Sequence, residues 1–106
     1  MKVIQNSMNK KPSKTKTSFY RRIYIAYLID SGINTVPKII TETGMHRRTA
    51  QDTILALKEL GMQHEFIGGN KDGSYRITSW GAIRKDWIIN NLQHVCNVLD
   101  YPVYKQ

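Results

Sequence analysis

The chain has 106 residues, of which 41% are hydrophobic and 23% charged, a composition typical of one globular domain and not of a disordered or fibrous protein. Sixteen Lys and Arg residues against eight Asp and Glu give a formal net charge of +8, so we expect a polyanionic partner, either nucleic acid or an anionic membrane surface. A single cysteine, Cys96, excludes an internal disulfide framework, and no apolar run approaches the ~18 residues of a membrane-spanning helix.

Positive charge is concentrated at the start of the chain. The first 22 residues hold seven Lys and Arg side chains and no acid, whereas the remainder is close to neutral. Residues 9–16 are polar and lack apolar periodicity, so residues 1–16 are predicted to form a flexible basic arm. Such an arm would bring Lys14 and Lys16 to DNA phosphates or into a minor groove, and a solubilising tail is the alternative.

Two helices are predicted after the arm. Thr17 and Ser18 are favourable N-cap residues, and residues 23–29 have no polar group except phenolic tips, so the first helix is expected to be buried on most sides. Thr35 is expected to cap a second, short helix, with Pro37 in its first turn, where a missing N–H costs nothing.

A third helix is predicted between Gly44 and Gly61. One side repeats apolar residues at intervals of three or four positions, as a buried stripe does: Ala50, Ile54, Leu57 and Leu60. The opposite side is polar and largely basic: Arg47, Arg48, Gln51, Asp52 and Lys58. The helix is therefore expected to pack by one face and to present the other to solvent or to a partner.

A β-hairpin and a last helix complete the predicted elements. After the third helix the apolar period falls to two, which predicts strands at 62–67 and 75–78 joined by a glycine-rich tip. Ser79 is expected to cap one long helix over residues 80–99, roughly 30 Å in length at ~1.5 Å per residue.

This order of elements resembles the winged helix-turn-helix family. The stretch that carries the resemblance is TVPKIITETGMHRRTAQDTI at residues 35–54, and residues 57–62 are similar to the usual bridge from recognition helix to wing. The resemblance covers roughly residues 18–78 and extends to a small group of uncharacterised bacterial winged-helix proteins that share the terminal helix. It implies a mainly α fold with a small β-hairpin wing, made of a three-helix core and a long C-terminal helix. The implied organisation is a basic arm at 1–16, a winged helix-turn-helix domain at 17–78 and a C-terminal helix at 79–106.

By this resemblance the third helix enters the major groove of double-stranded DNA, and the hairpin contacts the backbone or the minor groove. The residues assigned to the DNA-facing surface are Arg47, Arg48, Thr49, Gln51 and Asp52. His46, near the start of the same helix, is expected to be a polar cap or a phosphate contact. Arginine can pair with guanine and glutamine with adenine through two hydrogen bonds, while Thr49 and the first N–H groups of the helix can hold phosphate. On the hairpin, Lys71 and Arg76 are expected to contact phosphates.

Several of these residues have an alternative role within the chain. Arg48 and Asp52 are four residues apart and can pair with each other, an interaction worth about 0.3–0.5 kcal/mol when exposed. Asp52 would repel phosphate, and can instead accept from cytosine N4 or orient Arg48. Lys71 is next to Asp72, so the hairpin tip is nearly neutral and a plain turn is the alternative there.

The last helix carries more apolar surface than a three-helix core needs. The residues predicted to form a homodimer interface are Trp80, Trp87, Ile88, Leu92, Val95 and Leu99. A dimer of this kind suits palindromic half-sites about one helical turn (~34 Å) apart. The alternative is closure within one chain, with the last helix covering the first. Cys96 lies near the same stripe and is expected to be a small buried hydrophobe.

No feature of the sequence indicates an enzyme. The three histidines have no metal-ligand spacing, and no cofactor, metal, membrane partner or small-molecule effector is predicted. The first residues lack the apolar core of a signal peptide, so we expect a cytoplasmic protein. The predicted function is sequence-specific binding of double-stranded DNA by a small bacterial transcriptional regulator that acts as a homodimer. The alternative is a winged-helix module for protein–protein association that does not read DNA.

Overall fold

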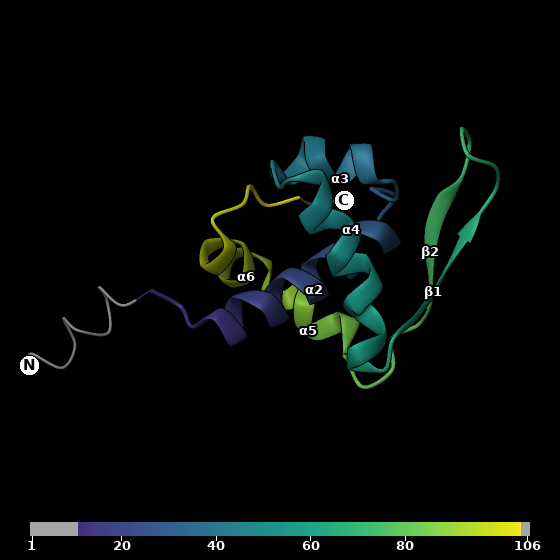
Figure 1. Cartoon of the computed structure of the whole chain (residues 1–106). Coiled ribbons are helices and arrows are strands. Elements are labelled where there is room, and N and C mark those ends of the chain that lie inside the picture. Colours follow the sequence, from purple (N-terminus) through teal and green to yellow (C-terminus); the bar gives the residue numbers. More distant parts are fainter. Residues whose placement is uncertain (1–10, 105–106) are drawn as a thin grey trace, which may run out of the picture.

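Helices and one β-hairpin follow each other along residues 11–104, the part of the chain that the computed structural model describes (Figure 1). In chain order they are α2 (Lys14–Asp30), α3 (Val36–Thr43), α4 (Arg47–Leu55), a 3-10 helix (Ala56–Leu60), β1 (Gln63–Ile67), β2 (Ser74–Ser79), α5 (Lys85–Asn90) and α6 (Leu92–Leu99). This is the expected mainly α fold with a β-hairpin wing. None of the helices in this range has the length and apolar character needed to cross a bilayer.

Helix α2 begins at Lys14, about one helical turn before the start predicted from an N-cap at Thr17 or Ser18. Ser13 is the N-cap, because its hydroxyl accepts the N–H of Lys16 at 3.0 Å, and the predicted cap was therefore wrong. Lys14 and Lys16 lie on a helix and not in a flexible arm, since serine caps as well as threonine does and lysine favours helix. Residues 1–10, the rest of the predicted arm, lie outside the described part of the chain.

Over residues 23–29, helix α2 is buried on every side, as expected for a run without charged groups. One side packs with α3, α4 and the base of the wing in an apolar cluster around Ile39 and Ile54. The other side packs against α5 and α6 in a second cluster around Ile88 and Val95. The helix thus separates two layers of the core, which is why apolar residues are needed at every position of the run.

Helices α3 and α4 form the helix-turn-helix. Thr35 caps α3 by accepting the N–H of Lys38 at 3.2 Å, and Gly44 ends the helix in the left-handed conformation, with φ of 79°. Helix α4 buries its apolar stripe as predicted and continues as the 3-10 helix. The single helix predicted up to Gly61 therefore changes to tighter winding after Leu55.

Strands β1 and β2 pair antiparallel to form the wing, with Glu65 opposite Arg76 and Phe66 opposite Tyr75. The N–H of Tyr75 donates to the carbonyl of Asn34 at 2.8 Å, which ties the wing to the loop between α2 and α3. Beyond this contact the hairpin projects from the body, as Figure 1 shows. Phe66 is 49% exposed for this reason, although the alternation of the strand is compatible with burial on one face.

The single long helix predicted for residues 80–99 does not form. Residues 80–84 are irregular, and the two short helices α5 and α6 follow, separated at Asn91. Gly81 has φ of 57°, which no right-handed helix accommodates, and Asn91 donates its side-chain amide to the carbonyl of Trp87 at 2.8 Å. The apolar period is nevertheless present, because Ile88 of α5 and the apolar residues of α6 pack against α2.

Four of the residues predicted for a dimer interface are buried inside this chain: Ile88, Leu92, Val95 and Leu99. Trp80 is partly buried between the two clusters, and Trp87 is 40% exposed. The prediction that the whole stripe faces a second copy is therefore wrong. The stripe instead covers the second apolar side of α2, which would otherwise be exposed to water.

Two tyrosines on α2 hold the segment that follows α6. Tyr24 donates its hydroxyl to the carbonyl of Pro102 at 3.1 Å and accepts the N–H of Tyr104 at 3.1 Å. Tyr27 donates to the carbonyl of Tyr104 at 2.8 Å. Burial raises the pKa of both tyrosines, and also the pKa of the Cys96 thiol, which is buried as expected.

Candidate nucleic-acid interface

The first turns of α4 lie on the surface with their polar side toward solvent. Ala50, Thr53 and Ile54 anchor the helix in the core. The exposed positions include five of the residues predicted to face DNA: His46, Arg47, Arg48, Gln51 and Asp52. Thr49, the sixth, is half-buried. His46 is the N-cap residue, but its side chain makes no capping hydrogen bond and so does not occupy the first N–H groups of the helix.

The two arginines at the start of α4 differ in their surroundings. Nε of Arg48 lies 3.8 Å from a carboxylate oxygen of Asp52, so the pairing expected as their alternative role is present. Both side chains are exposed, and such a pair contributes about 0.3–0.5 kcal/mol. Arg47 forms no ion pair with any residue between 11 and 104, which leaves its guanidinium open to an external acceptor.

Arg47 and Gln51 line a groove of about 400 Å³ between α4, the start of α3 and the wing. From the wing, Phe66, Lys71 and Tyr75 line the same groove. The groove thus has a cationic side chain on two of its walls, one from the helix and one from the hairpin tip. Three residues that were predicted separately as contacts, on two different elements, are brought together here.

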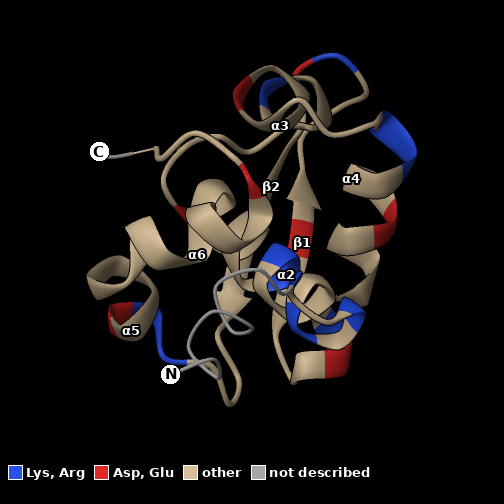
Figure 2. Cartoon of the chain, turned by 90° about the vertical axis from the view of Figure 1, so that its left-hand side faces the viewer, with Lys and Arg blue, Asp and Glu red and all other residues tan. Residues whose placement is uncertain are grey.

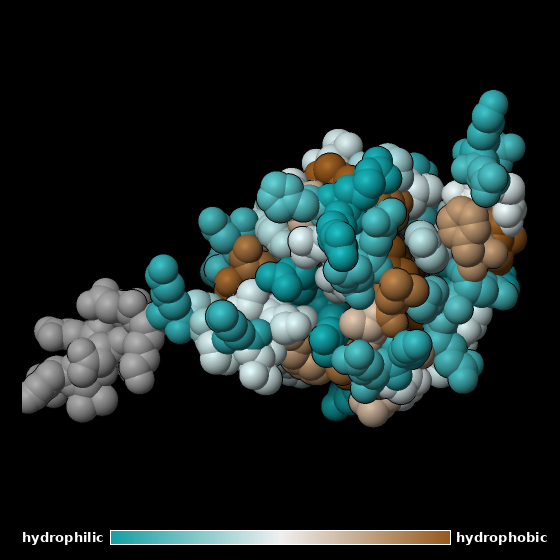
Figure 3. Space-filling view, in the orientation of Figure 1, coloured by the Kyte–Doolittle hydropathy of each residue, from teal (hydrophilic) through white to brown (hydrophobic). Residues whose placement is uncertain are grey.

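The two basic residues of the wing are not equivalent. Arg76 donates from Nε to a carboxylate oxygen of Glu65 at 3.1 Å, across the hairpin, so its charge is compensated within the wing. Lys71 is exposed and forms no ion pair among residues 11–104. Phe66 and Ile67 expose apolar surface on β1, and Figure 3 shows hydrophobic surface on the wing beneath a hydrophilic tip.

Basic side chains also lie along the first half of α2. Lys14 and Lys16 are exposed there, and two half-buried arginines follow one turn later. Figure 2 shows basic segments on α2 and at the start of α4, with acidic segments on α4 and β1. Thr49 and Asp52 line a second groove, of about 250 Å³, between α2 and α4. The predicted contacts on α4 are therefore divided between two grooves.

Several residues at these surfaces were not predicted from the sequence as contacts, among them Ser18 and Arg21 on the α2 wall of the second groove. Leu55 is 63% exposed at the end of the polar face of α4, and its position out of phase with the buried stripe was the available signal. Phe66 and Tyr75 line the groove at the wing. No sequence signal marks them, because their exposure depends on where the hairpin leaves the body of the fold.

The surface around α4 offers hydrogen-bond donors and positive charge. Within residues 11–104, no group of three or more His, Cys, Asp or Glu side chains is arranged to hold a metal ion. The thiol of Cys96 is buried and lines neither groove. The exposed guanidinium, amide and ammonium groups of Arg47, Gln51 and Lys71 can bind an anionic, hydrogen-bonding partner.

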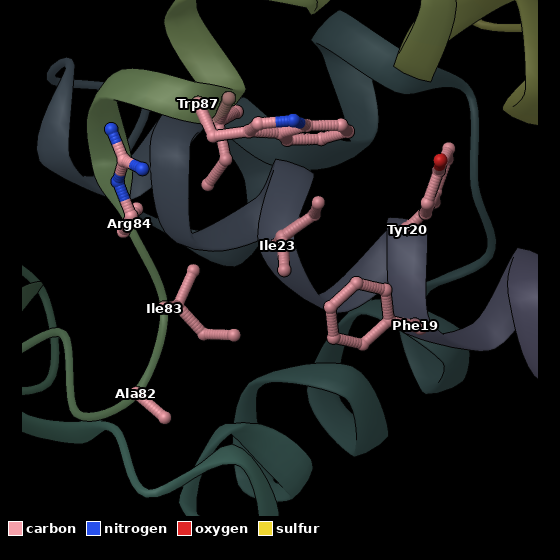
Figure 4. Close-up of a pocket in the computed structure, with 8 residues that line it drawn as sticks. Phe19, Tyr20, Ile23, Ala82, Ile83, Arg84 and Trp87 are labelled. Carbon is pink, nitrogen blue, oxygen red and sulfur yellow. The ribbon is translucent and has the colours of Figure 1, made fainter.

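An apolar hollow of about 320 Å³ lies between α2 and α5 (Figure 4). Its lining comes from α2 and from the segment that leads into α5: Phe19, Tyr20, Ile23, Ala82, Ile83, Arg84, Trp87 and Ile88. Phe19 is 37% exposed and Trp87 is 40% exposed, so two aromatic rings stand at the edge of the hollow. Arg84 pairs with Asp86 at 2.6 Å, and this pairing lowers the pKa of the Asp86 carboxyl.

Comparisons with known proteins identify a family and a related crystal structure. A family model described as winged helix-turn helix matches residues 14–99. The crystal structure of a DUF2131 family protein from Shewanella amazonensis is similar to this chain, with a TM-score of 0.79. The two sequences are 32% identical, and the match covers 85% of this chain and 96% of that one. No curated protein matches the chain.

Proposed function

The chain belongs to the winged helix-turn-helix family, whose model spans α2 to α6, and on this premise we propose that it binds double-stranded DNA in a sequence-specific manner. We further propose that it is a small, cytoplasmic transcriptional regulator of bacteria that acts as a homodimer. The observation that carries the proposal is the exposed start of α4, where Arg47 and Gln51 share a groove with Lys71 of the wing. Donors from a helix and from a hairpin tip suit a duplex, which displays base acceptors beside phosphates.

In this proposal the first turns of α4 read the bases. An α-helix with its side chains is about 10–12 Å in diameter and the major groove is about 12 Å wide, so α4 can enter it. Arg47 and Arg48 each donate two hydrogen bonds to a guanine, and Gln51 pairs with an adenine. Asp52 orients the Arg48 guanidinium, from which it lies 3.8 Å away.

The backbone contacts are proposed to come from both sides of α4. Lys71 at the wing tip and the exposed Lys14 and Lys16 on α2 supply positive charge. His46 at the N-cap of α4 and Thr49 in its first turn add polar contacts to phosphate. Arg76 contributes less, because Glu65 already accepts from it. Each phosphate that is neutralised steepens the salt dependence of binding by about 0.9 in the log–log slope.

A second copy of the chain is proposed to occupy the apolar hollow between α2 and α5. The same face carries a hollow and two exposed rings, Phe19 and Trp87, so a two-fold axis allows each copy to insert a ring into the other. The neighbouring charges are also self-complementary, since Arg84, which lines the hollow, and Asp86 of one copy can pair with Asp86 and Arg84 of the other. The resulting dimer would read two half-sites.

The experiment is a selection of binding sequences from a random double-stranded library, followed by fluorescence anisotropy at several salt concentrations. The enriched duplex is compared with a scrambled duplex of the same composition. The test variant is Arg47→Ala/Arg48→Ala, and the matched control is Arg47→Lys/Arg48→Lys, which keeps both charges but not the paired hydrogen bonds. We expect both variants to lose preference for the enriched duplex, by ~1–3 kcal/mol for each lost paired contact. The lysine variant alone should keep its affinity for the scrambled duplex.

The opposite result is weak binding that is indifferent to sequence and unchanged in the alanine variant. It would remove α4 from the DNA and leave the basic residues of α2 as a non-specific contact. The fold would then be used for association with another protein, and the exposed face of α4 would be the surface to test against protein partners.

A further inference from the structure

The second groove, between α2 and α4, has a lining suited to a small anion. Its volume is about 250 Å³, and its residues come from the first half of α2 and from α4 with the first residue of the 3-10 helix. They are polar or small, and among them are Ser18, Arg21, Thr49 and Asp52. The groove therefore combines a guanidinium with hydroxyl groups, the donors that proteins commonly offer to phosphate.

Arg21 carries the strongest indication of a ligand. Its Nε is buried and has no hydrogen-bond acceptor among residues 11–104. A buried N–H group without an acceptor is uncommon in a folded protein, and such groups are normally satisfied by water, an ion or a ligand. The same side chain lines the groove, so a rotation of its guanidinium would bring Nε within reach of an acceptor that enters the groove.

The acidic residues around this groove already have basic partners. Glu59 lies 3.5 Å from Arg22, and Asp52 lies 3.8 Å from Arg48. Asp52 also lines the groove and disfavours an anion near its own carboxylate. Arg21 forms no ion pair within residues 11–104, so the positive charge that remains uncompensated lies on the α2 wall.

The basic and hydroxyl residues of α2 form a row along the helix. Lys14, Ser18 and Arg21 are spaced by four and three residues, which places them on one face of α2. Lys14 is exposed one turn beyond the groove. An extended anion such as a phosphodiester strand can therefore follow this face from the groove toward the start of α2.

The groove also lies where a DNA strand would pass. Thr49 follows Arg47 by two residues, a rotation of roughly 200° on an α-helix, and the two residues line different grooves. A helix in the major groove has a phosphate strand on each side, because the groove, about 12 Å wide, is little wider than the helix. If the wing meets one strand, the α2 side of α4 faces the other.

We propose that the groove between α2 and α4 binds a backbone phosphate of the DNA strand opposite the wing, with Arg21 as the principal donor and Ser18 and Thr49 as hydroxyl donors. This inference rests on the proposed DNA binding and adds a contact from α2 to it. A phosphate in the groove provides the acceptor that Nε of Arg21 lacks. The contact is to the backbone, so it strengthens binding to all sequences alike.

The test uses the full chain, the duplex enriched by selection and its scrambled counterpart, in anisotropy titrations from low to high salt. Arg21→Gln is compared with Lys85→Gln, a matched loss of one positive charge on α5, outside both grooves. We expect Arg21→Gln to weaken binding to both duplexes about tenfold and to reduce the salt slope by about 0.9. Lys85→Gln should change neither quantity. Thermal melts followed by circular dichroism establish that both variants are folded.

A second measurement uses enriched duplexes that carry a neutral methylphosphonate at a single backbone position. If Arg21 had only a structural role, the wild type and the Arg21 variant would respond to these duplexes in the same way. Neutralising the bound phosphate should lower the affinity of the wild-type chain for the duplex about tenfold and leave the affinity of Arg21→Gln unchanged. If Arg21→Gln does not fold, Arg21→Lys replaces it and should show a reduced methylphosphonate effect, since it keeps the charge and lacks Nε–H.

Two outcomes overturn the inference in distinguishable ways. In the first outcome, the wild-type chain prefers the enriched duplex, and a folded Arg21 variant shows the same salt slope and the same methylphosphonate response as the wild type. This result removes the phosphate site and leaves the proposed DNA binding intact. A wild-type chain that binds neither duplex removes the proposed function and this site together.

Discussion

Gly81 packs directly against Gly61: a β carbon at position 81 would lie far inside van der Waals distance of the Gly61 carbonyl oxygen. Gly61 ends the 3-10 helix before β1, and Gly81 follows β2, so the two residues close the base of the wing. Gly81 also has φ of 57°, in the left-handed region. Glycine is required at position 81 both for its backbone conformation and for this close approach.

We expect Gly81→Ala to lower the free energy of unfolding by more than about 2 kcal/mol, because the left-handed conformation alone costs about 1–2 kcal/mol for alanine and the contact with backbone adds to it. Gly69→Ala is the matched control, since a β carbon there meets nothing within 4 Å. Urea denaturation followed by circular dichroism measures both. Equal midpoints for the two variants would show that the base of the wing can open without loss of stability.

Removing one hydroxyl should loosen the end of the chain. Tyr24→Phe deletes a group that donates to Pro102 and accepts from Tyr104, and we expect a loss of about 1–3 kcal/mol because two backbone groups lose their partner. Tyr101→Phe is the control, since Tyr101 packs its ring near Tyr24 but no hydrogen bond joins its hydroxyl to another described residue. Thermal melts distinguish the two variants, and equal melting temperatures would contradict the proposed role of the Tyr24 hydroxyl.

Alkaline pH should destabilise the fold through the buried tyrosines of α2 and the buried thiol of α6. Burial raises the pKa of Tyr24, Tyr27 and Cys96 in the folded chain, and each group is neutral when protonated. The unfolded chain therefore releases these protons first, near the ordinary pKa of 9.0 for the thiol and 10.0 for the tyrosines, and stability falls as pH rises through these values. Melting temperatures recorded from about pH 8 to about pH 11 should decline, and the decline should be smaller in Tyr24→Phe. A Tm that is constant over this range would contradict the prediction.

The carboxylate beside Arg48 is expected to restrain binding to DNA of arbitrary sequence. Asp52→Asn removes a charge that repels phosphate and releases Arg48 from its 3.8 Å pair, so affinity for a scrambled duplex should rise several-fold and the salt slope should steepen by up to about 0.9. Asp100→Asn is the charge-matched control, since Asp100 is exposed beyond α6 in a left-handed conformation that asparagine also adopts. Anisotropy titrations measure both, and equal slopes in the two variants would remove Asp52 from the interface.

Self-association should depend on the two rings at the apolar hollow. We expect Phe19→Ala/Trp87→Ala to weaken the dimer at least about thirtyfold, as the loss of a central aromatic anchor does, while each chain stays folded. Ile89→Ala is the control, because Ile89 is exposed on α5 but does not line the hollow. Sedimentation velocity over a range of concentrations gives the dissociation constants. A wild-type chain that is monomeric at every concentration would contradict the proposed dimer.

Local patterns in the sequence determined the helix-turn-helix, the hairpin and one face of the site. Spacings of three and four residues in α4 separate Ala50 and Ile54 from Arg47 and Gln51 within three helical turns, so the buried and exposed sides are decided by the helix itself. Thr35 and Gly44 bound α3 for equally local reasons, through a hydroxyl cap and a left-handed end. These features were predicted correctly because each depends on residues that are neighbours in the chain.

The tertiary structure decided what each apolar face packs against. The stripe from Ile88 to Leu99 predicts a helix surface but not its partner, and only the second apolar side of α2 makes it a core and not a dimer interface. The hydrogen bonds of Tyr24 to a segment 78 residues away, and the grooves on either side of α4, likewise join elements that are remote in sequence. Periodicity reports which way a side chain points along its own helix, whereas the surface that it meets is set by how the helices pack together.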